Sequence, residues 1–417
     1  MCCTQFPRPP VIMVIIFSPA MSPSVESCND VFEKKVVSVL DRVQLKSLTS
    51  LRFFAAAFIA IGHSGAQPGF EMFKFDLFNA GNAVSFFYVL SGFILTYTYF
   101  NMDEKRNYRR YIVARIGRVW PLHLVTLAFC VYEFGPVPSF SSGWDSTTKL
   151  VANAFLLHSW VPYADWFYSY NWVSWSISTE LAFYVSFPAL LFLMKKDWRL
   201  IAALAAVLLA TMLGVCMALN LPARPSFDAV SSSGLLYISP LCRIVEFMAG
   251  MLTWKVYRSL RDRQASSLAS TAIEVGALSL LVLAMSATHL LWKYDKNLVP
   301  GGVMGWLATA GSFPFIALAI VVMAKQKGLV SKALSNEVLV YLGEISFSVY
   351  MVHQIVLRLF GKNYSDLIVS NPIAMYSMFW AATLLISALL YHLVETPCRK
   401  LARKKLSGRT SVINVTA

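Results

Sequence analysis

The sequence contains few charged residues for its length. Of its 417 residues, 14% are Asp, Glu, Lys or Arg, whereas 57% are hydrophobic. A soluble globular chain carries about a quarter charged residues. Apolar runs of about 20 residues, long enough to cross the hydrocarbon core of a bilayer, recur along the chain. These features exclude an ordinary soluble protein and predict an all-α integral membrane protein.

Acidic residues are scarcer than basic ones, 22 against 36, which gives a formal charge of +14. Such a charge could indicate binding to nucleic acid. However, the basic residues lie in short clusters between the apolar runs, which is the positive-inside pattern of membrane proteins. The charge therefore predicts a lipid bilayer, and no nucleic acid, as the partner.

Metal-type cysteine motifs are also lacking. None of the seven cysteines forms a C-x-x-C pair or has the spacing of metal ligands. Cys130, Cys216 and Cys242 fall in apolar segments, where cysteine acts as a small core residue. We therefore expect no metal site.

Hydropathy predicts about ten membrane helices. They are expected near residues 48–66, 80–100, 119–137, 173–194, 198–220, 234–254, 271–292, 301–323, 337–360 and 371–393. Alternate connecting segments, starting with the N-terminal one, hold 28 Lys and Arg residues, and the opposite loops hold 7. This asymmetry predicts that both termini are cytoplasmic.

Three regions follow from this pattern. Residues 1–47 are expected to be a poorly ordered cytoplasmic extension, 48–398 the ten-helix membrane domain, and 399–417 a basic cytoplasmic tail. The apolar run VIMVIIF near the start is too short to span a membrane, and Met21 is an alternative start of translation. No internal repeat is visible.

The first predicted helix contains two polar residues that need an explanation, Arg52 and His63. A charged side chain in hydrocarbon costs roughly 2.5–3.5 kcal/mol on insertion scales. Eleven residues separate the two by roughly 16 Å along a helix, about three turns, so they share one face. The predicted topology places Arg52 near the cytoplasm and His63 in the outer half.

Two other predicted helices carry polar residues toward the outside. In the fourth helix, Glu180 is expected roughly 12 Å below the outer surface of the membrane. In the ninth helix, Ser346, Tyr350 and His353 form a polar stripe on one face. We therefore expect His63, Glu180 and His353 to meet. The structural alternatives are that His353 only bonds a neighbouring helix and that Glu180 pairs with an arginine such as Arg243.

Basic and aromatic clusters allow two interpretations each. Arg109, Arg110, Arg115 and Arg118 lie in the expected cytoplasmic loop 101–118, where they follow the topology and could contact lipid headgroups. Arginine also binds phosphate with two hydrogen bonds, which favours a polyanion site.

The outer loop 138–172 is rich in aromatic residues, consistent with an interfacial belt or with a platform for sugars. These residues are Trp144, Trp160, Trp166, Trp172, Tyr163, Tyr168 and Tyr170.

Six motifs, in order along residues 48–400, resemble those of the membrane acyltransferase-3 family. They are R-x10-H (Arg52 to His63), FFYVLSGFILTYTY, ARIGRVWPLH, WSISTELAFY, LGEISFSVYMVHQ and ETPCRK. One departure is that Leu122 and His123 follow the tryptophan-proline pair, where many members have a tyrosine nearby. Many members also carry a soluble domain; if one is needed to present the acceptor, a separate protein must supply it.

The resemblance implies a ten-helix O-acyltransferase of the inner (plasma) membrane. Such proteins take an acyl group, usually acetyl, from cytoplasmic acyl-CoA and transfer it to a hydroxyl, often of a cell-surface carbohydrate or glycolipid. Acyl-CoA is then a substrate, and no permanently bound cofactor is expected. The resemblance assigns three sets of residues: His63 and Glu180 as catalytic, Arg52, Arg115 and Arg118 as acyl-CoA-binding, and Ser91, Tyr350 and His353 as lining the site.

The residues leave several mechanisms open. His63 could take the acceptor hydroxyl's proton, with Glu180 orienting the imidazole, or it could form an acyl-histidine. A different class, a transporter that uses His63 and Glu180 as a proton relay, is the main alternative. A scaffold is a weaker one, because it leaves the buried polar residues unexplained.

Overall fold

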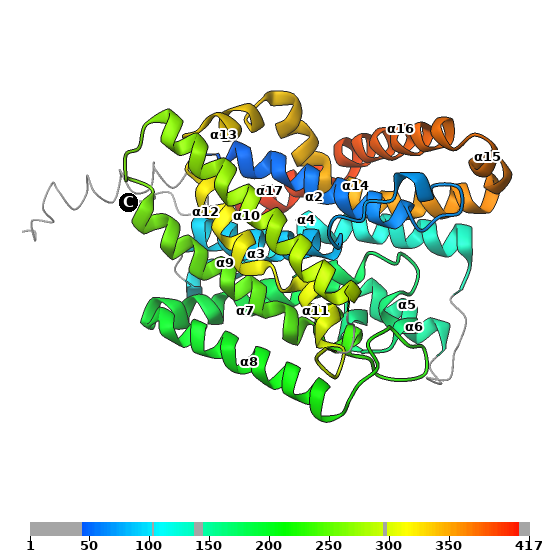
Figure 1. Ribbon diagram of the computed structural model, residues 1–417, viewed down its shortest axis with the longest axis horizontal. Helices are drawn as coiled ribbons and strands as arrows, with labels where there is room; N and C mark the ends of the chain where they lie inside the picture. The colour runs from blue at the N-terminus through cyan, green and yellow to red at the C-terminus, as the bar shows by residue number, and fades with distance from the viewer. Residues whose placement is uncertain (1–43, 102–103, 137–144, 295–297, 408–417) are drawn as a thin grey trace, which may run out of the picture. The chain divides into compact units, whose positions relative to one another are not determined.

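The computed structural model describes residues 44–101, 104–136, 145–294 and 298–407 (Figure 1). Expectations about residues 1–43, including a start at Met21, and about 408–417 fall outside this range, as does Trp144. Within it the chain is helical and has no strand. The long helices are α2 Lys46–Ser64, α3 Gly81–Tyr99, α4 Glu104–Phe134, α7 Trp175–Lys196, α8 Trp198–Ala218, α9 Pro240–Leu260, α10 Ser267–Tyr294, α12 Phe313–Ala324, α14 Glu337–Asn363, α16 Pro372–Leu390 and α17 Thr396–Ser407.

Short elements connect the long helices. Two of them, η3 and η4, are π-helical. Element η3 precedes α9, and η4 follows α16. The short elements are η1 Glu71–Phe73, α5 Ser146–Ala154, η2 His158–Trp160, α6 Ala164–Phe167, η3 Ser233–Ile238, α11 Val303–Ala310, α13 Leu329–Leu334, α15 Ser365–Ser370 and η4 Tyr391–Glu395. Single π-helical turns interrupt the regular hydrogen bonding of helices and often occur at functional sites.

Every predicted membrane segment coincides with a helix or a helical pair. Eight helical stretches in the described part of the chain are long and apolar enough to cross a membrane, so the protein is a multi-span membrane protein. The two helices outside this group are α2 and α3. Both are 19 residues long, and both carry polar residues that lower their hydropathy. The count of ten spans and the orientation of the termini stay predictions.

The basic segment 101–118 was expected to be a loop, and that expectation is wrong for most of its length. Helix α4 begins at Glu104 and runs without interruption to Phe134. Arginine and lysine are good helix formers, and no proline occurs before Pro121, so nothing in the segment ends the helix. The arginines therefore have fixed positions on a rigid element.

The helices pack as two close pairs joined by a common core. Helix α2 lies along α14, and α3 lies along α9 (Figure 1). Apolar side chains from α2, α3, α7, α9, α12 and α14 form one continuous cluster. Helices α2 and α14 are thereby held against each other over several turns.

Two glycines allow α3 and α9 to approach very closely. A Cβ atom on Gly92 would lie 2.0 Å from the carbonyl oxygen of Phe247. A Cβ atom on Gly250 would lie 2.0 Å from the carbonyl oxygen of Val89. Both distances are shorter than van der Waals contact, so these positions require glycine, as in the small-residue contacts of membrane helices.

Candidate active site

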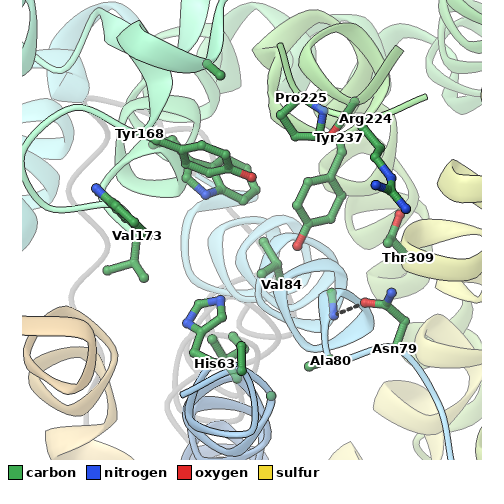
Figure 2. Close-up of a pocket in the computed structure, with 18 of the residues that line it drawn as sticks. His63, Asn79, Ala80, Val84, Tyr168, Val173, Arg224, Pro225, Tyr237 and Thr309 are labelled. Atoms are coloured by element: carbon green, nitrogen blue, oxygen red, sulfur yellow. Dashed lines mark hydrogen bonds between the residues drawn. The ribbon is translucent and has the colours of Figure 1, made fainter. Parts of the chain in front are cut away.

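A cavity of about 1420 Å³ lies at the end of the bundle where α2 ends and α7 begins. We call this the outer end, after the predicted topology, and the opposite one the inner end. The cavity walls are rich in aromatic residues, including Tyr168, Trp172, Trp175 and Tyr237. Figure 2 shows the imidazole of His63 and the hydroxyl of Tyr237 pointing into this space. Its volume exceeds the roughly 300–1,000 Å³ of typical small-molecule sites.

His63 forms a hydrogen bond with His353 across the α2–α14 contact. The distance from His63 Nδ1 to His353 Nε2 is 2.9 Å, and the two rings are nearly parallel. His353 is completely buried, whereas His63 is accessible from the cavity. This contact confirms that the first and ninth predicted membrane segments bring these two residues together.

The backbone determines how protons are arranged on the two rings. His353 Nδ1 lies 3.2 Å from the carbonyl oxygen of Val349, which can only accept a hydrogen bond. His353 Nδ1 therefore carries the proton, and in the neutral ring Nε2 is an acceptor. His63 Nδ1 then donates to it, which leaves Nε2 as the unprotonated nitrogen of neutral His63. That nitrogen can accept a proton from a bound molecule.

Tyr350 anchors the outer part of α14 to α7. Its hydroxyl donates to the carbonyl oxygen of Val173 (3.0 Å) and bonds Ser176 Oγ (2.8 Å). Tyr350 also lines the cavity, and its ring lies next to His353. Because its hydroxyl is already engaged with the protein, Tyr350 positions the helix that carries His353.

Glu180 is hydrogen-bonded to residues other than the two histidines. Its carboxylate accepts hydrogen bonds from Tyr184 (2.5 Å) and Ser91 (3.4 Å). Within the described residues, the His63 ring is hydrogen-bonded to His353 and not to Glu180. His353 is therefore the side chain that contacts the His63 ring nitrogen. The catalytic assignment of Glu180 itself stays a prediction.

The carboxylate of Glu180 also lies near a group of charged residues. Arg52 lies within electrostatic range of Glu180, Glu395 and Arg118. Neither Arg52 nor Arg118 makes a hydrogen bond to another described side chain or backbone group, so their N–H groups are available to a ligand. Glu395, on the π-helical turn η4, was not singled out from the sequence. It is buried and lies close to Arg399 (3.5 Å).

Arg115 has a well-defined aromatic partner. Its guanidinium donates to the hydroxyl of Tyr99 (3.1 Å), and its charge lies 5.4 Å from the centre of that ring. The buried Nε atom of Arg115 has no hydrogen-bond partner among the described groups. Arg52, Arg115 and Arg118 thus occupy the inner side of the bundle, away from the cavity wall.

Arg243 does not pair with Glu180, the alternative considered for that carboxylate. It forms a buried ion pair with Glu246 (2.6 Å) on the same helix. Its guanidinium lies 4.8 Å from the centre of the Tyr88 ring and 4.9 Å from that of Tyr237. A charge buried in this way requires such partners. Arg243 therefore supports the cavity wall through Tyr237.

The outer loops have their own polar interior. Lys149 and Asp165 form an ion pair of 2.7 Å, and both side chains are fully buried. Nearby, His158 Nε2 bonds Ser174 Oγ (3.2 Å). Burial lowers the pKa of His158 from 6.5 to about 3. These loops are therefore a packed structure that covers one side of the cavity.

The aromatic residues of the outer loops fall into two groups, one that lines the cavity and one that lies at the surface. Tyr168, Tyr170 and Trp172 line the cavity, whereas Trp160 is exposed at the surface.

Elsewhere on the cavity wall, Asp76 contacts Lys293 and His289. The hydrogen bond from Lys293 holds the pKa of Asp76 below its usual value of 3.8. Among the described residues, no cluster of three or more His, Cys, Asp or Glu could hold a metal ion.

Comparisons with known proteins agree with this arrangement. The sequence profile of the acyltransferase domain family (Acyl_transf_3) matches residues 45–392. "Acyltransferase MdmB" of Streptomyces mycarofaciens is 29% identical over 396 residues, which cover 87% of this chain and 94% of that protein. "Putative peptidoglycan O-acetyltransferase YrhL" of Bacillus subtilis (strain 168) is 24% identical over 392 residues. The match covers 88% of this chain but only 57% of the Bacillus protein.

A Staphylococcus aureus (strain MRSA252) protein, "Putative O-acetyltransferase SAR0937", is 24% identical over 249 residues, covering 57% of this chain and 38% of that protein. No solved structure matches the chain. The family profile covers most of the chain, including the His63–His353 pair and both arginine-bearing helices. The protein is therefore an acyltransferase and belongs to the membrane acyltransferase-3 family.

Proposed function

We propose that the protein is an O-acyltransferase of the inner (plasma) membrane that moves an acetyl group from cytoplasmic acetyl-CoA to a hydroxyl of a carbohydrate or glycolipid. One observation carries this proposal. The His63–His353 pair is placed between an outer cavity large enough for a glycan and an inner group of arginines. The two substrates would approach the imidazole from opposite ends.

The arginines suit the phosphate end of acyl-CoA. Arginine forms paired hydrogen bonds with phosphate oxygens, and Arg52 and Arg118 have N–H groups available for them. The thioester lies at the end of a long pantetheine arm, so a reactive group must lie deeper than the phosphates. His63 is eleven residues from Arg52 on the same helix, roughly 16 Å along its axis, which provides that separation.

The reaction then follows from the proton arrangement on His63. Its free Nε2 takes the proton of the acceptor hydroxyl while the hydroxyl oxygen attacks the thioester carbonyl carbon. The new C–O bond forms and the C–S bond breaks. The imidazolium returns its proton to the departing sulfur, which leaves as the thiol of coenzyme A. Atoms and charges balance without a further reactant.

In this proposal, the cavity binds the acceptor. Aromatic rings stack on the apolar faces of sugars, and Tyr168 and Trp172 lie in the wall. The name of the Bacillus relative refers to peptidoglycan, but this chain spans only 57% of that protein.

The test uses purified protein, radiolabelled acetyl-CoA and an extract of native host cells. We expect label to appear in the extract together with free coenzyme A thiol. His63→Ala should abolish both, and His392→Ala is the matched control because His392 contacts Tyr341, outside the cavity. A fully active His63→Ala protein would overturn the mechanism. A transporter with a proton relay through His63 and Glu180 would release no thiol.

A further inference from the structure

Gln354 is a polar residue of the cavity wall to which the proposed reaction gives no role. It follows His353 on α14, lines the same cavity as His63, and is only 8% exposed. Neighbouring residues on a helix differ by a rise of 1.5 Å, so the Gln354 side chain begins at nearly the same level as that of His353. The Gln354 amide and the His63 imidazole therefore both border the same cavity.

The amide oxygen of Gln354 has no hydrogen-bond partner among the described residues. Two other polar groups of the wall are, by contrast, already bonded to the protein. The Tyr350 hydroxyl donates to the carbonyl oxygen of Val173 (3.0 Å), and the Thr309 hydroxyl donates to that of Gly305 (2.9 Å). A buried acceptor without a donor is costly, so each such group in a native protein requires an explanation.

A ligand can provide the missing donor. His63 Nε2 is an acceptor for the hydroxyl that becomes acylated, and the Gln354 amide oxygen is a second acceptor in the same cavity. A ligand that satisfies both must offer two donors close together. Neighbouring hydroxyls of a sugar ring have this arrangement, and the aromatic walls suit the ring's apolar face.

We infer that Gln354 binds a second hydroxyl of the acceptor, next to the one that is acylated, and so selects for polyols such as sugars. This inference rests on the proposed O-acyltransferase function. It adds that recognition depends on a hydroxyl that does not react. Gln354 is thus a residue that determines specificity.

The test measures acetyl transfer from radiolabelled acetyl-CoA to cyclohexyl β-D-glucopyranoside and to its 2-, 3-, 4- and 6-deoxy derivatives. One derivative lacks the reacting hydroxyl and should accept no label. Another lacks the hydroxyl bound by Gln354, and its kcat/KM should be at least about 10-fold lower than that of the parent, because the buried amide loses its partner. Gln354→Leu should remove this difference, and Gln354→Glu, which keeps an acceptor oxygen, should retain it.

Thr309→Val is the matched control, because its hydroxyl already bonds its own helix. It should keep the selectivity of the unmodified protein. The inference is overturned if Gln354→Leu discriminates among the deoxy derivatives as the unmodified protein does. It is also overturned if no glucoside is acetylated while the host extract is. Failure with the extract as well would instead reject the proposed function.

Discussion

Replacing His353 with leucine should slow acyl transfer without weakening the binding of acyl-CoA. The substitution removes the acceptor of the 2.9 Å hydrogen bond from His63 Nδ1. A hydrogen bond of this kind contributes about 0.5–1.5 kcal/mol net, or roughly 2- to 13-fold in rate. The variant also loses the constraint that keeps His63 Nε2 unprotonated. General acid–base catalysis contributes about 10²–10⁴-fold in total, which bounds the effect. We expect kcat to fall roughly 10- to 100-fold.

The assay is the release of coenzyme A thiol in the presence of host-cell extract, measured over a range of acetyl-CoA concentrations. The KM for acetyl-CoA should stay constant, because His353 lies away from Arg52 and Arg118. His353→Gln offers an amide oxygen to His63 Nδ1 and should recover part of the rate. An unchanged kcat in His353→Leu, or equal losses in the leucine and glutamine variants, would refute the proposed orientation of His63.

Three further predictions concern other parts of the molecule. Arg118→Gln should raise the KM for acetyl-CoA by roughly 10- to 150-fold, since a charged hydrogen bond contributes about 1.5–3 kcal/mol; an unchanged KM would exclude Arg118 from the donor site. Lys149→Met leaves Asp165 buried without its cation and should lower the unfolding free energy by about 3–5 kcal/mol, seen as reduced thermal stability in detergent, whereas the double variant with Asp165→Leu should recover much of it. The lowered pKa of His158 means that the unfolded chain binds more protons than the folded one between about pH 6.5 and 3, so stability should fall as the pH drops through this window and His158→Gln should reduce that dependence.

The sequence predicted much of the helical architecture, because long apolar runs and helical periodicity are local properties. The pairing of His63 with His353 followed from their predicted depths, and the structure confirms the contact. The hydrogen-bond partners of Glu180, which are Tyr184 and Ser91, were not predicted. Which residue of another helix Glu180 contacts depends on how α7 packs against α3, and no local pattern encodes that packing.

Other features of the site depend on contacts between distant segments. Glu246 was not recognised as the partner of Arg243, although a spacing of three residues on one helix could have indicated it. Gln354 is a polar residue in an apolar helix, which is a detectable signal. Its missing hydrogen bond, however, becomes visible only when the surrounding wall is in place. The helical start of α4 at Glu104 was missed because its charge suggested a loop.

The close contact of α3 with α9 has a consequence for substrate size. Val84 on α3 and Tyr237, just before α9, both line the cavity, and Figure 2 shows them on neighbouring parts of its wall. The separation of their helices is determined by hydrogen atoms at Gly92 and Gly250, where any larger group would collide with the opposite backbone. Alanine at either position would act as a spacer between the two helices. The dimensions of the cavity are thus controlled by two positions that lie outside its wall.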